Sequence, residues 1–356
     1  MNTFWSPVVG QLSPYVPGEQ PKVEGLIKLN TNENPYPPSG RVIEAIREAL
    51  GTDGAGLRLY PDPESTALRE AAASRLNLSI DHVFAGNGSD EVLAFVFQGL
   101  LHQTTPLVFP DISYSFYPSY CRLYQIAQDP LPLTDSFELD LSRIPQDRQA
   151  VIFPNPNAPT GRALRREEIE AFVAARPHTL VVVDEAYVDF GAESCAPLVA
   201  AYPNLLVTQS LSKSHSLAGM RIGLAFGQPL LLEAIRRIKD SFNSYPLDRL
   251  AQAAGTAALQ DAAWLTENRA AVLGSRDWLT GALQGLGFQV LPSAANFVFT
   301  QHKGQQASHL AAGLRAHRIL VRHFQRPRIE NWLRISVGTQ AECEALVEAL
   351  ESLLSR

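Results

Sequence analysis

The sequence alternates short apolar runs with amphipathic helical segments, and this alternation most constrains the fold. The runs are rich in β-branched residues and read HVFAG, PLVFP, AVIFPNP, TLVVVDEAY, NLLVTQS and RIGLAFG. Several of them stand roughly 25–30 residues apart, with segments such as RREEIEAFVAARP between them, which is typical of βαβ units. The sequence therefore predicts an α/β fold with a largely parallel sheet.

The length of 356 residues predicts more than one domain, because single hydrophobic cores rarely grow this large. A helical region starts at PLLLEAIRRIKDSF, and short strands and a closing helix, QAECEALVEALESLL, follow it. The first 40 residues are rich in proline and asparagine. We expect an N-terminal arm without regular structure that packs with the small domain (1–40), a large domain (41–240) and a small α+β domain (241–356).

Composition excludes several classes of partner. The formal net charge is −6, and no run of Lys or Arg offers a patch for nucleic-acid phosphates. The three cysteines are far apart and lack the spacing of metal ligands. No stretch of about 18 apolar residues and no secretory leader is present. We expect a cytoplasmic protein that binds neither nucleic acid, membrane nor metal.

Polar residues follow the predicted strands at their carboxyl ends, where open parallel sheets bind ligands. In GNGSDE, Ser89 and Asp90 start a helix behind two glycines, and the free N–H groups there suit a phosphate. An ordinary helix cap is the alternative. Asp184 ends the run TLVVVD and Tyr187 follows three residues later, although an aspartate there is often only a turn residue.

The stretch SLSKSHSLAGMRIG surrounds Lys213 with Ser210, Ser212 and Arg221, which could together bind an anion. A solvated amine and a structural ion pair are the alternatives for the two basic residues. The asparagine loop NPNAPTG, which contains Asn157, follows another strand. A phosphate cup, an aspartate, an asparagine loop and a lysine on consecutive strand ends together predict a site for a phosphorylated cofactor that bonds covalently to an amine.

The ordered motifs resemble those of the fold-type I, pyridoxal-phosphate-dependent aminotransferases and, within them, the histidinol-phosphate aminotransferases. They cover nearly the whole chain and read PYVPGEQP, KLNTNENPYPPS, LYPDP, GNGSDE, NPNAPTG, VDEAYVDF, SLSKSHSLAGMRIG and LRISVGT. The resemblance implies a large domain with a mostly parallel sheet flanked by helices, a smaller α+β domain and a homodimer. It also implies pyridoxal 5'-phosphate as cofactor and transamination of histidinol phosphate with 2-oxoglutarate in histidine biosynthesis.

The resemblance also implies a role for each matching residue. Lys213 would bond to the cofactor and carry a proton, Asp184 would lie against the pyridine nitrogen, and Tyr187 would bond the phenolic ring oxygen. Tyr114 would stack on the ring. The implied phosphate ligands are the N–H groups of Ser89 and Asp90, the side chains of Ser210, Ser212 and Arg221, and Tyr60 of the neighbouring subunit.

Substrate binding is implied for three residues. In WLRISVG, Arg334 alternates with Leu333 and Ile335, so it is either solvated or lines the cleft. The resemblance makes Arg334 the carboxylate-binding arginine, because a planar guanidinium suits two oxygens at once. Arg322 and Tyr15 resemble contacts to the substrate phosphate.

The chain departs from the family pattern at two places. Most relatives carry asparagine directly before PTG, where it bonds the ring oxygen, whereas this chain has Ala158. We expect Asn157 to take over through a shifted turn, the alternative being that Tyr187 acts without it. His215 follows the lysine by two residues and could serve acid–base chemistry, but we expect only a packing change.

Rival functions remain open at this point. A broad-specificity aromatic amino acid aminotransferase, or a decarboxylase of a phosphorylated amino acid, would use the same scaffold. A non-catalytic regulator would be expected to carry an added DNA-binding domain. A generic nucleotide-binding module is disfavoured, because GNGSDE lacks the G-x-G-x-x-G spacing.

Overall fold

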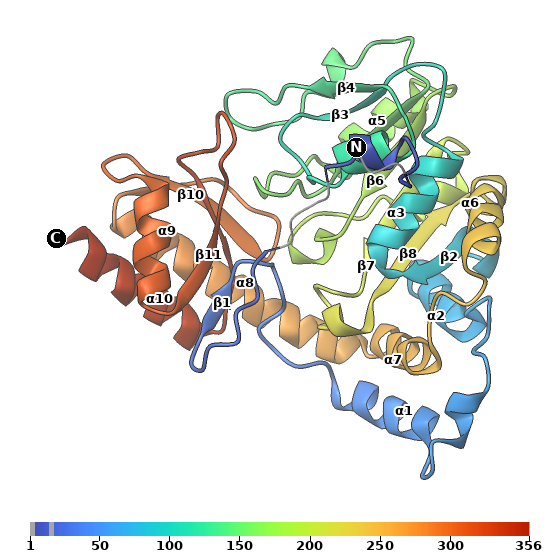
Figure 1. Ribbon diagram of the computed structural model, residues 1–356, viewed down its shortest axis with the longest axis horizontal. Coiled ribbons are helices and arrows are strands. Elements are labelled where there is room, and N and C mark those ends of the chain that lie inside the picture. Colours follow the sequence, from blue (N-terminus) through green and yellow to red (C-terminus); the bar gives the residue numbers. More distant parts are fainter. Residues whose placement is uncertain (1–3, 14–17, 356) are drawn as a thin grey trace.

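A computed structural model describes residues 4–13 and 18–355 and contains two β-sheets, each with its own helices (Figure 1). The larger sheet has seven strands, and β8 runs antiparallel to both of its neighbours while the strands from β7 to β4 are parallel. The α/β class with a mostly parallel sheet is therefore confirmed. In sheet order the strands are β2 (Val83–Asn87), β8 (Ile222–Gly227), β7 (Leu205–Ser210), β6 (Leu180–Asp184), β5 (Ala150–Pro154), β3 (Leu107–Pro110) and β4 (Gln128–Leu131).

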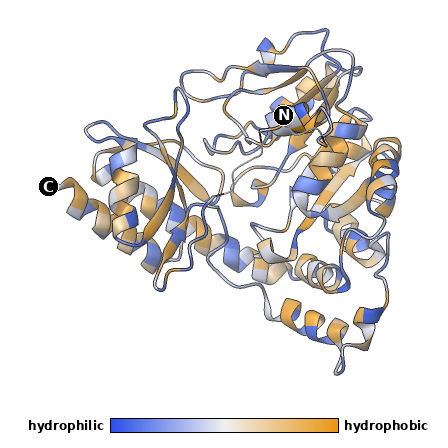
Figure 2. Cartoon of the chain, viewed as in Figure 1, coloured by the Kyte–Doolittle hydropathy of each residue, from blue (hydrophilic) through white to orange (hydrophobic). Residues whose placement is uncertain are grey.

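The central strands are buried on both faces, as expected for parallel strands covered by helices. Val181, Val182 and Val183 of β6 are fully buried, and Figure 2 shows hydrophobic residues along these strands. The sequence did not reveal β4, which is half exposed and carries Pro130. Proline is tolerated there because β4 is the edge strand.

Helices cover both faces of this sheet. One hydrophobic core includes residues of α1, α2, α5 and α7, and a second, on the other face, includes residues of α3, α4 and α6. The helices are α1 (Gly40–Leu50), α2 (Thr66–Leu76), α3 (Gly88–Gly99), α4 (Tyr117–Leu123), α5 (Arg166–Ala174), α6 (Pro229–Phe242) and α7 (Arg249–Gln260). Helix α7 packs on α1 and α2. The predicted boundaries at 40 and 240 stay predictions.

The smaller sheet has five strands and packs with three helices. Its strands, in sheet order, are β1 (Ile27–Leu29), β11 (Ile319–His323), β12 (Leu333–Ser336), β10 (Phe297–His302) and β9 (Phe288–Val290). The helices are α8 (Ala262–Gly285), α9 (Ala307–Ala316) and α10 (Gln340–Leu354). Short 3₁₀ turns are η1 (Val9–Gln11), η2 (Ala55–Arg58), η3 (Ile80–His82), η4 (Leu141–Arg143), η5 (Val188–Phe190), η6 (Ala196–Ala200) and η7 (Ala218–Met220). Within residues 4–13 and 18–355, no helix is long and apolar enough to cross a membrane.

The described part of the N-terminal arm contains the short turn η1 and a strand, so the expectation of an arm without regular structure is wrong there. Residues Ile27–Leu29 form β1, which pairs in parallel with β11 of the small sheet. Three residues carry too little periodicity to predict a strand, and the β11 edge supplies the missing hydrogen bonds. This pairing fixes where the following loop, residues 30–34, enters the space between the two sheets.

Candidate active site

A cavity of about 640 Å³ lies between the two sheets and collects most of the predicted site residues. The large domain lines it with the carboxyl ends of β5, β6 and β7 and with the start of α3, and the small domain with β11, β12 and the loop after β1. The predicted residues that line it are Ser89, Asp90, Tyr114, Asp184, Tyr187, Ser210, Ser212, Lys213, Arg221, Arg322 and Arg334.

Asp184, the last residue of β6, is only 4% exposed. Tyr117 Oη donates a hydrogen bond to its Oδ2 at 2.9 Å, and Thr208 Oγ1 donates to its Oδ1 at 3.2 Å. Burial raises the pKa of the carboxyl to about 6, although both hydrogen bonds lower it. A carboxylate buried this deeply is stabilised by a cationic partner, so the cavity suits a ligand with a protonated nitrogen.

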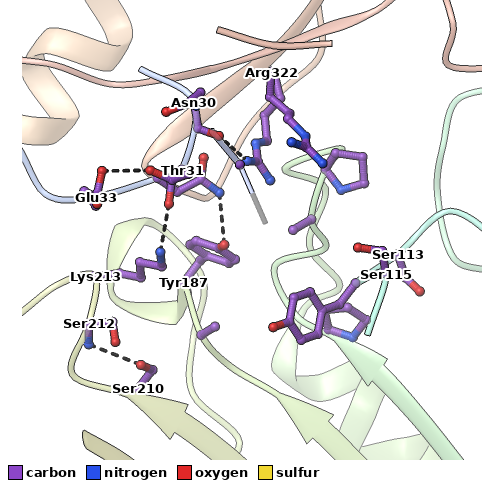
Figure 3. A pocket seen from close by; sticks show the side chains of 18 of the residues that line it. Asn30, Thr31, Glu33, Ser113, Ser115, Tyr187, Ser210, Ser212, Lys213 and Arg322 are labelled. Carbon is purple, nitrogen blue, oxygen red and sulfur yellow. Dashed lines mark hydrogen bonds between the residues drawn. The ribbon is translucent and has the colours of Figure 1, made fainter. Parts of the chain in front are cut away.

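Lys213 lies in the loop after β7, and its Nζ donates to the carbonyl oxygen of Thr31 at 3.0 Å (Figure 3). Burial and, after it, the positive charge of Arg334 lower the pKa of Lys213, which comes to about 8. The carboxylate of Glu33 opposes both effects. A substantial fraction of the amine is therefore neutral near physiological pH, as a nucleophile or general base requires.

The start of α3 forms a cup for an anion. Gly88 has φ +84°, and a Cβ there would lie 2.6 Å from Arg221 Nη2, so only glycine leaves room for the guanidinium. A Cβ on Gly223 would lie 2.4 Å from the backbone nitrogen of Ser89. Strand β8 and the helix start thus touch through their backbones. The free N–H groups of α3 and the Arg221 charge together favour a phosphate.

Asp90 links this cup to an aromatic wall. Its carboxylate accepts a hydrogen bond from Tyr114 Oη at 2.6 Å and forms an ion pair with Arg221 Nη2 at 3.0 Å. Ser212 donates its backbone N–H to Ser210 Oγ at 3.2 Å, which orders the turn before Lys213. Figure 3 shows Ser210 and Ser212 on one side of Lys213 and Arg322 on the other.

The small domain contributes two arginines. Arg334 Nη2 donates to the carbonyl oxygen of Asn30 at 2.8 Å, and its guanidinium lies 5.5 Å from the ring centre of Phe297. Arg322 lies 5.8 Å from the ring centre of Phe324. The predicted alternation of β12 is observed, since Leu333 and Ile335 are buried in the small-domain core while Arg334 lines the cavity.

Three predicted residues lie elsewhere. Asn157 does not line this cavity, because its amide nitrogen donates to the Ile112 carbonyl oxygen at 3.0 Å and to Thr160 Oγ1 at 2.9 Å. The expected takeover by Asn157 is therefore not what the structure has, and Ala158 lines the cavity instead. Tyr60 is 78% exposed and stacks on Tyr245 with ring centres 4.5 Å apart. Tyr15 falls outside the described residues.

His215 is buried away from the cavity. Its Nδ1 lies 2.9 Å from Ser214 Oγ, which donates to Asp189 Oδ2 at 2.5 Å, and Asp189 pairs with Arg75 at 2.7 Å. Burial lowers the pKa of His215 to about 4, so the ring is neutral at physiological pH. This position agrees with the expected packing role.

Sequence reasoning missed the residues of the loop after β1. Asn30, Thr31, Asn32 and Glu33 all line the cavity, and Asn34 Nδ2 donates to the Lys213 carbonyl oxygen at 2.9 Å. The stretch NTNEN is part of the motif KLNTNENPYPPS, for which the sequence alone predicts no residue role. The signal that could have predicted a role is the three asparagines in five residues, directly after a short apolar run. Buried amide side chains need hydrogen-bond partners, so several of them together indicate a polar site.

Comparisons with known proteins agree with this geometry. Residues 24–350 match the family model described as aminotransferase class I and II. The chain is 57% identical over 355 residues to histidinol-phosphate aminotransferase 1 of Burkholderia pseudomallei, covering 100% of both chains. It is 58% identical over 358 residues to the protein of the same name from Bordetella parapertussis, again with full coverage. The crystal structure of histidinol-phosphate aminotransferase from Sinorhizobium meliloti, in complex with pyridoxal-5'-phosphate, superposes with a TM-score of 0.89 at 27% identity, over 100% of this chain and 98% of that one.

Proposed function

We propose, from the premise that this chain belongs to the class I and II aminotransferases, that it transfers the amino group of histidinol phosphate to 2-oxoglutarate with pyridoxal 5'-phosphate as cofactor. The products are imidazole-acetol phosphate and glutamate, and the reaction belongs to histidine biosynthesis. The observation that carries the proposal is that Asp184 and Lys213 line one cavity together with an anion cup and two arginines.

The residues of the cavity fit this cofactor. Asp184 is a carboxyl group whose pKa is raised by burial, and a protonated pyridine nitrogen would supply the positive charge that stabilises its ionised form. The glycines of the cup let Arg221 and strand β8 lie against the start of α3, whose N–H groups suit a phosphate. When bound, the cofactor supplies a ring that accepts electrons from the substrate α-carbon.

Each residue then has a distinct task. Asp184 would hold a proton at the ring nitrogen, and Tyr187 would donate to the phenolic ring oxygen. Tyr114 would support the face of the ring. Lys213 would hold the cofactor through its amine and, with that amine free, would move a proton at the substrate α-carbon. The phosphate would be held by the N–H groups of Ser89 and Asp90 and by the side chains of Ser210, Ser212 and Arg221.

Substrate recognition rests on the two arginines of the small domain. Arg322 and Arg334 line the same cavity as the phosphate cup, so the cavity holds positive charge in two regions. One region binds the cofactor phosphate, and the other binds the phosphate of histidinol phosphate or a carboxylate of 2-oxoglutarate in turn. Such alternation between substrates on one site corresponds to a ping-pong mechanism.

The enzyme acts as a homodimer in the cytoplasm in this proposal. Support for a dimer comes from exposed apolar side chains of the large domain, among which Tyr60 stacks on Tyr245. The others are Leu57, Leu59 and Phe242. Tyr60 would then reach the cofactor phosphate of the neighbouring subunit. Support for the cytoplasm comes from the three cysteines, which are all buried as free thiols.

The experiment that tests the function compares kcat/KM for histidinol phosphate and phenylalanine in the purified holoenzyme. A large preference for histidinol phosphate is expected, because phenylalanine cannot neutralise the arginines through a phosphate. Equal values would instead indicate an aromatic aminotransferase, and release of carbon dioxide a decarboxylase. Lys213→Ala should lose the visible absorbance band of the bound cofactor together with activity, whereas a fully active variant would contradict the proposal.

A further inference from the structure

Three consecutive residues of the loop after β1 each contact one functional side chain. The Asn30 carbonyl oxygen accepts from Arg334 Nη2, and the Thr31 carbonyl oxygen accepts from Lys213 Nζ. Asn32 differs because it uses its side chain, donating from Nδ2 to Tyr187 Oη at 3.0 Å. Asn32 is therefore the one member of this trio whose contact a substitution can remove.

The amide of Asn32 is held in a single orientation. Asn32 is 1% exposed, and its Oδ1 accepts a hydrogen bond from Ser336 Oγ at 3.0 Å. The same hydroxyl oxygen accepts from the Asn32 backbone N–H at 2.8 Å, and Asn296 Nδ2 donates to the Asn32 carbonyl oxygen at 3.0 Å. Since Oδ1 already serves Ser336, the amide NH₂ is left to Tyr187.

Asn32 also has the backbone conformation that suits its residue type. Its φ is +56°, in the left-handed region that asparagine tolerates better than most residues other than glycine. The loop therefore places an amide, and not an apolar side chain, beside the tyrosine. Aspartate shares this tolerance, which makes it the suitable replacement in a test.

Tyr187 also contacts apolar side chains. Ala158 belongs to a small apolar cluster with Ala295 and Phe297, and the Tyr187 ring packs against that cluster, edge-on to Phe297 at 5.1 Å. Asn157 is the other candidate donor, but its amide nitrogen donates to the Ile112 carbonyl oxygen and to Thr160 Oγ1. The amide that reaches the hydroxyl of Tyr187 comes from Asn32, across 155 positions of sequence.

We infer that Asn32 is a positioning residue that orients the Tyr187 hydroxyl toward the ring oxygen of the bound cofactor, an inference that rests on the proposed function. A phenolic oxygen that accepts from the Asn32 amide directs its own O–H away from that amide. Tyr187 lines the cavity, where the ring oxygen of the bound cofactor would be the acceptor for that proton. In this chain, Asn32 acting through Tyr187 replaces the direct amide contact that Ala158 cannot make.

The test uses the visible absorbance of the bound cofactor, titrated with pH, in the wild-type holoenzyme and in Asn32→Asp. The substitution keeps the size of the side chain and the acceptor for Ser336 but replaces the donor with an oxygen that draws the Tyr187 proton away. The ring oxygen then loses a donor and holds more negative charge, which stabilises the protonated form. The midpoint of the titration should rise by roughly 0.5–1 pH unit.

A double-variant cycle separates positioning from a merely structural role. Tyr187→Phe should raise the midpoint at least as far as Asn32→Asp, and adding Asn32→Asp to Tyr187→Phe should raise it no further. Asn296→Asp is the matched control, because it alters a buried amide of the same network that does not contact Tyr187. It should lower the melting temperature without moving the midpoint.

Two outcomes would overturn the inference while leaving the function intact: an unchanged midpoint in Asn32→Asp, or a further rise in the double variant. A wild-type protein without a pH-dependent band would overturn the cofactor assignment and the role of Asn32 with it. An Asn32→Asp protein that melts like the wild type and shows the raised midpoint would support the inference.

Discussion

At the scale of single residues, the site is governed by how burial and nearby charge set proton affinities. Lys213 and Asp184 are both withdrawn from water, and burial moves the pKa of the amine down to about 8 and that of the carboxyl up to about 6. Both shifts favour the neutral form of the side chain. Each group therefore depends on its neighbours for the protonation state that the reaction needs.

Glu33 offers a test of this dependence. Its carboxylate raises the pKa of Lys213, so Glu33→Gln should lower that pKa below about 8 and leave more neutral amine at a given pH. The acid limb of the kcat profile should move to lower pH by roughly 0.3–0.5 unit. Steady-state kinetics between pH 5.5 and 9.5 measure this, at about half-unit steps. Glu19→Gln, at an exposed ion pair with Arg315, is the control, and a shift toward higher pH would refute the argument.

Asp184 should limit the stability of the apo-protein at neutral pH. Its folded pKa is raised above the ordinary 3.8, so its stabilising effect is present below pH 3.8 and is lost as pH rises through about 6. Asp184→Asn should abolish activity yet raise the free energy of unfolding of the apo-protein at pH 8 by about 2 kcal/mol. Urea unfolding at pH 5 and pH 8 checks both the gain and its pH dependence.

Asp189→Asn is the matched control for that experiment. Although burial opposes it, the charge of Arg75 holds the pKa of Asp189 below its usual range, so the sign of the effect is reversed. Its stabilising effect is present above the ordinary pKa and lost as pH falls through the lowered one. Asp189→Asn should therefore destabilise the protein at pH 8. Equal changes in the two variants would show that burial does not control Asp184.

At the scale of elements, the phosphate cup depends on the contact between β8 and the start of α3. A Cβ at Gly223 would meet backbone atoms of Gly88 and Ser89 at 2.4 Å, and backbone cannot move aside as a flexible side chain can. The strand therefore sets where the N–H groups of α3 point. This contact is formed by residues 135 positions apart, 223 − 88, and it has no local sequence signature beyond two glycines.

Gly223→Ala should weaken cofactor binding by displacing the start of α3. We expect the dissociation constant of pyridoxal 5'-phosphate to rise by roughly 10–100-fold, which corresponds to about 1.4–2.8 kcal/mol. Absorbance titration of the apo-protein measures it. Gly219→Ala is the control, since a Cβ there would meet nothing within 4 Å, and an equal loss in both variants would contradict the packing argument.

At the scale of the whole molecule, the two sheets share one cavity, and the proposed dimer completes it. The large sheet contributes strand ends, while the small sheet contributes arginines and, through β1, the loop of residues 30–34. Tyr60 lies outside this cavity within its own chain and is exposed. The proposed contact of Tyr60 with a neighbouring site therefore has a direct consequence for mixed dimers.

Subunits carrying Tyr60→Ala and Lys213→Ala should complement each other. A mixed dimer has one site with an intact lysine and an intact tyrosine from the partner, and one site that lacks both. After equal mixing and exchange, activity should reach about a quarter of the wild-type value per subunit, because half of the dimers are mixed and half of their sites are intact. Activity that stays at the mean of the two parents would refute a shared site.

Much of the site was predictable from particular residues. Asp184 and Ser210 end buried strands, and the carboxyl ends of parallel strands meet at one edge of a sheet, so their proximity follows from local pattern alone. Lys213 and Arg221 follow Ser210 at the end of β7, so they are expected near the same edge of the sheet. The strand β1 and the edge strand β4 were not predictable, because a three-residue run and a proline-containing run carry little periodicity.

The sequence by itself thus determined the α/β architecture and the residues at the strand ends, because hydrophobic periodicity and strand-end chemistry are local properties. Only the tertiary structure decided what the loop after β1 does: the pairing of β1 with β11 brings Thr31 to Lys213 and Asn32 to Tyr187. It also decided that the amide of Asn157 donates to Thr160 in its own turn and to Ile112. Hydrogen bonds between residues more than 150 positions apart depend on the course of the whole chain, and no local pattern encodes them.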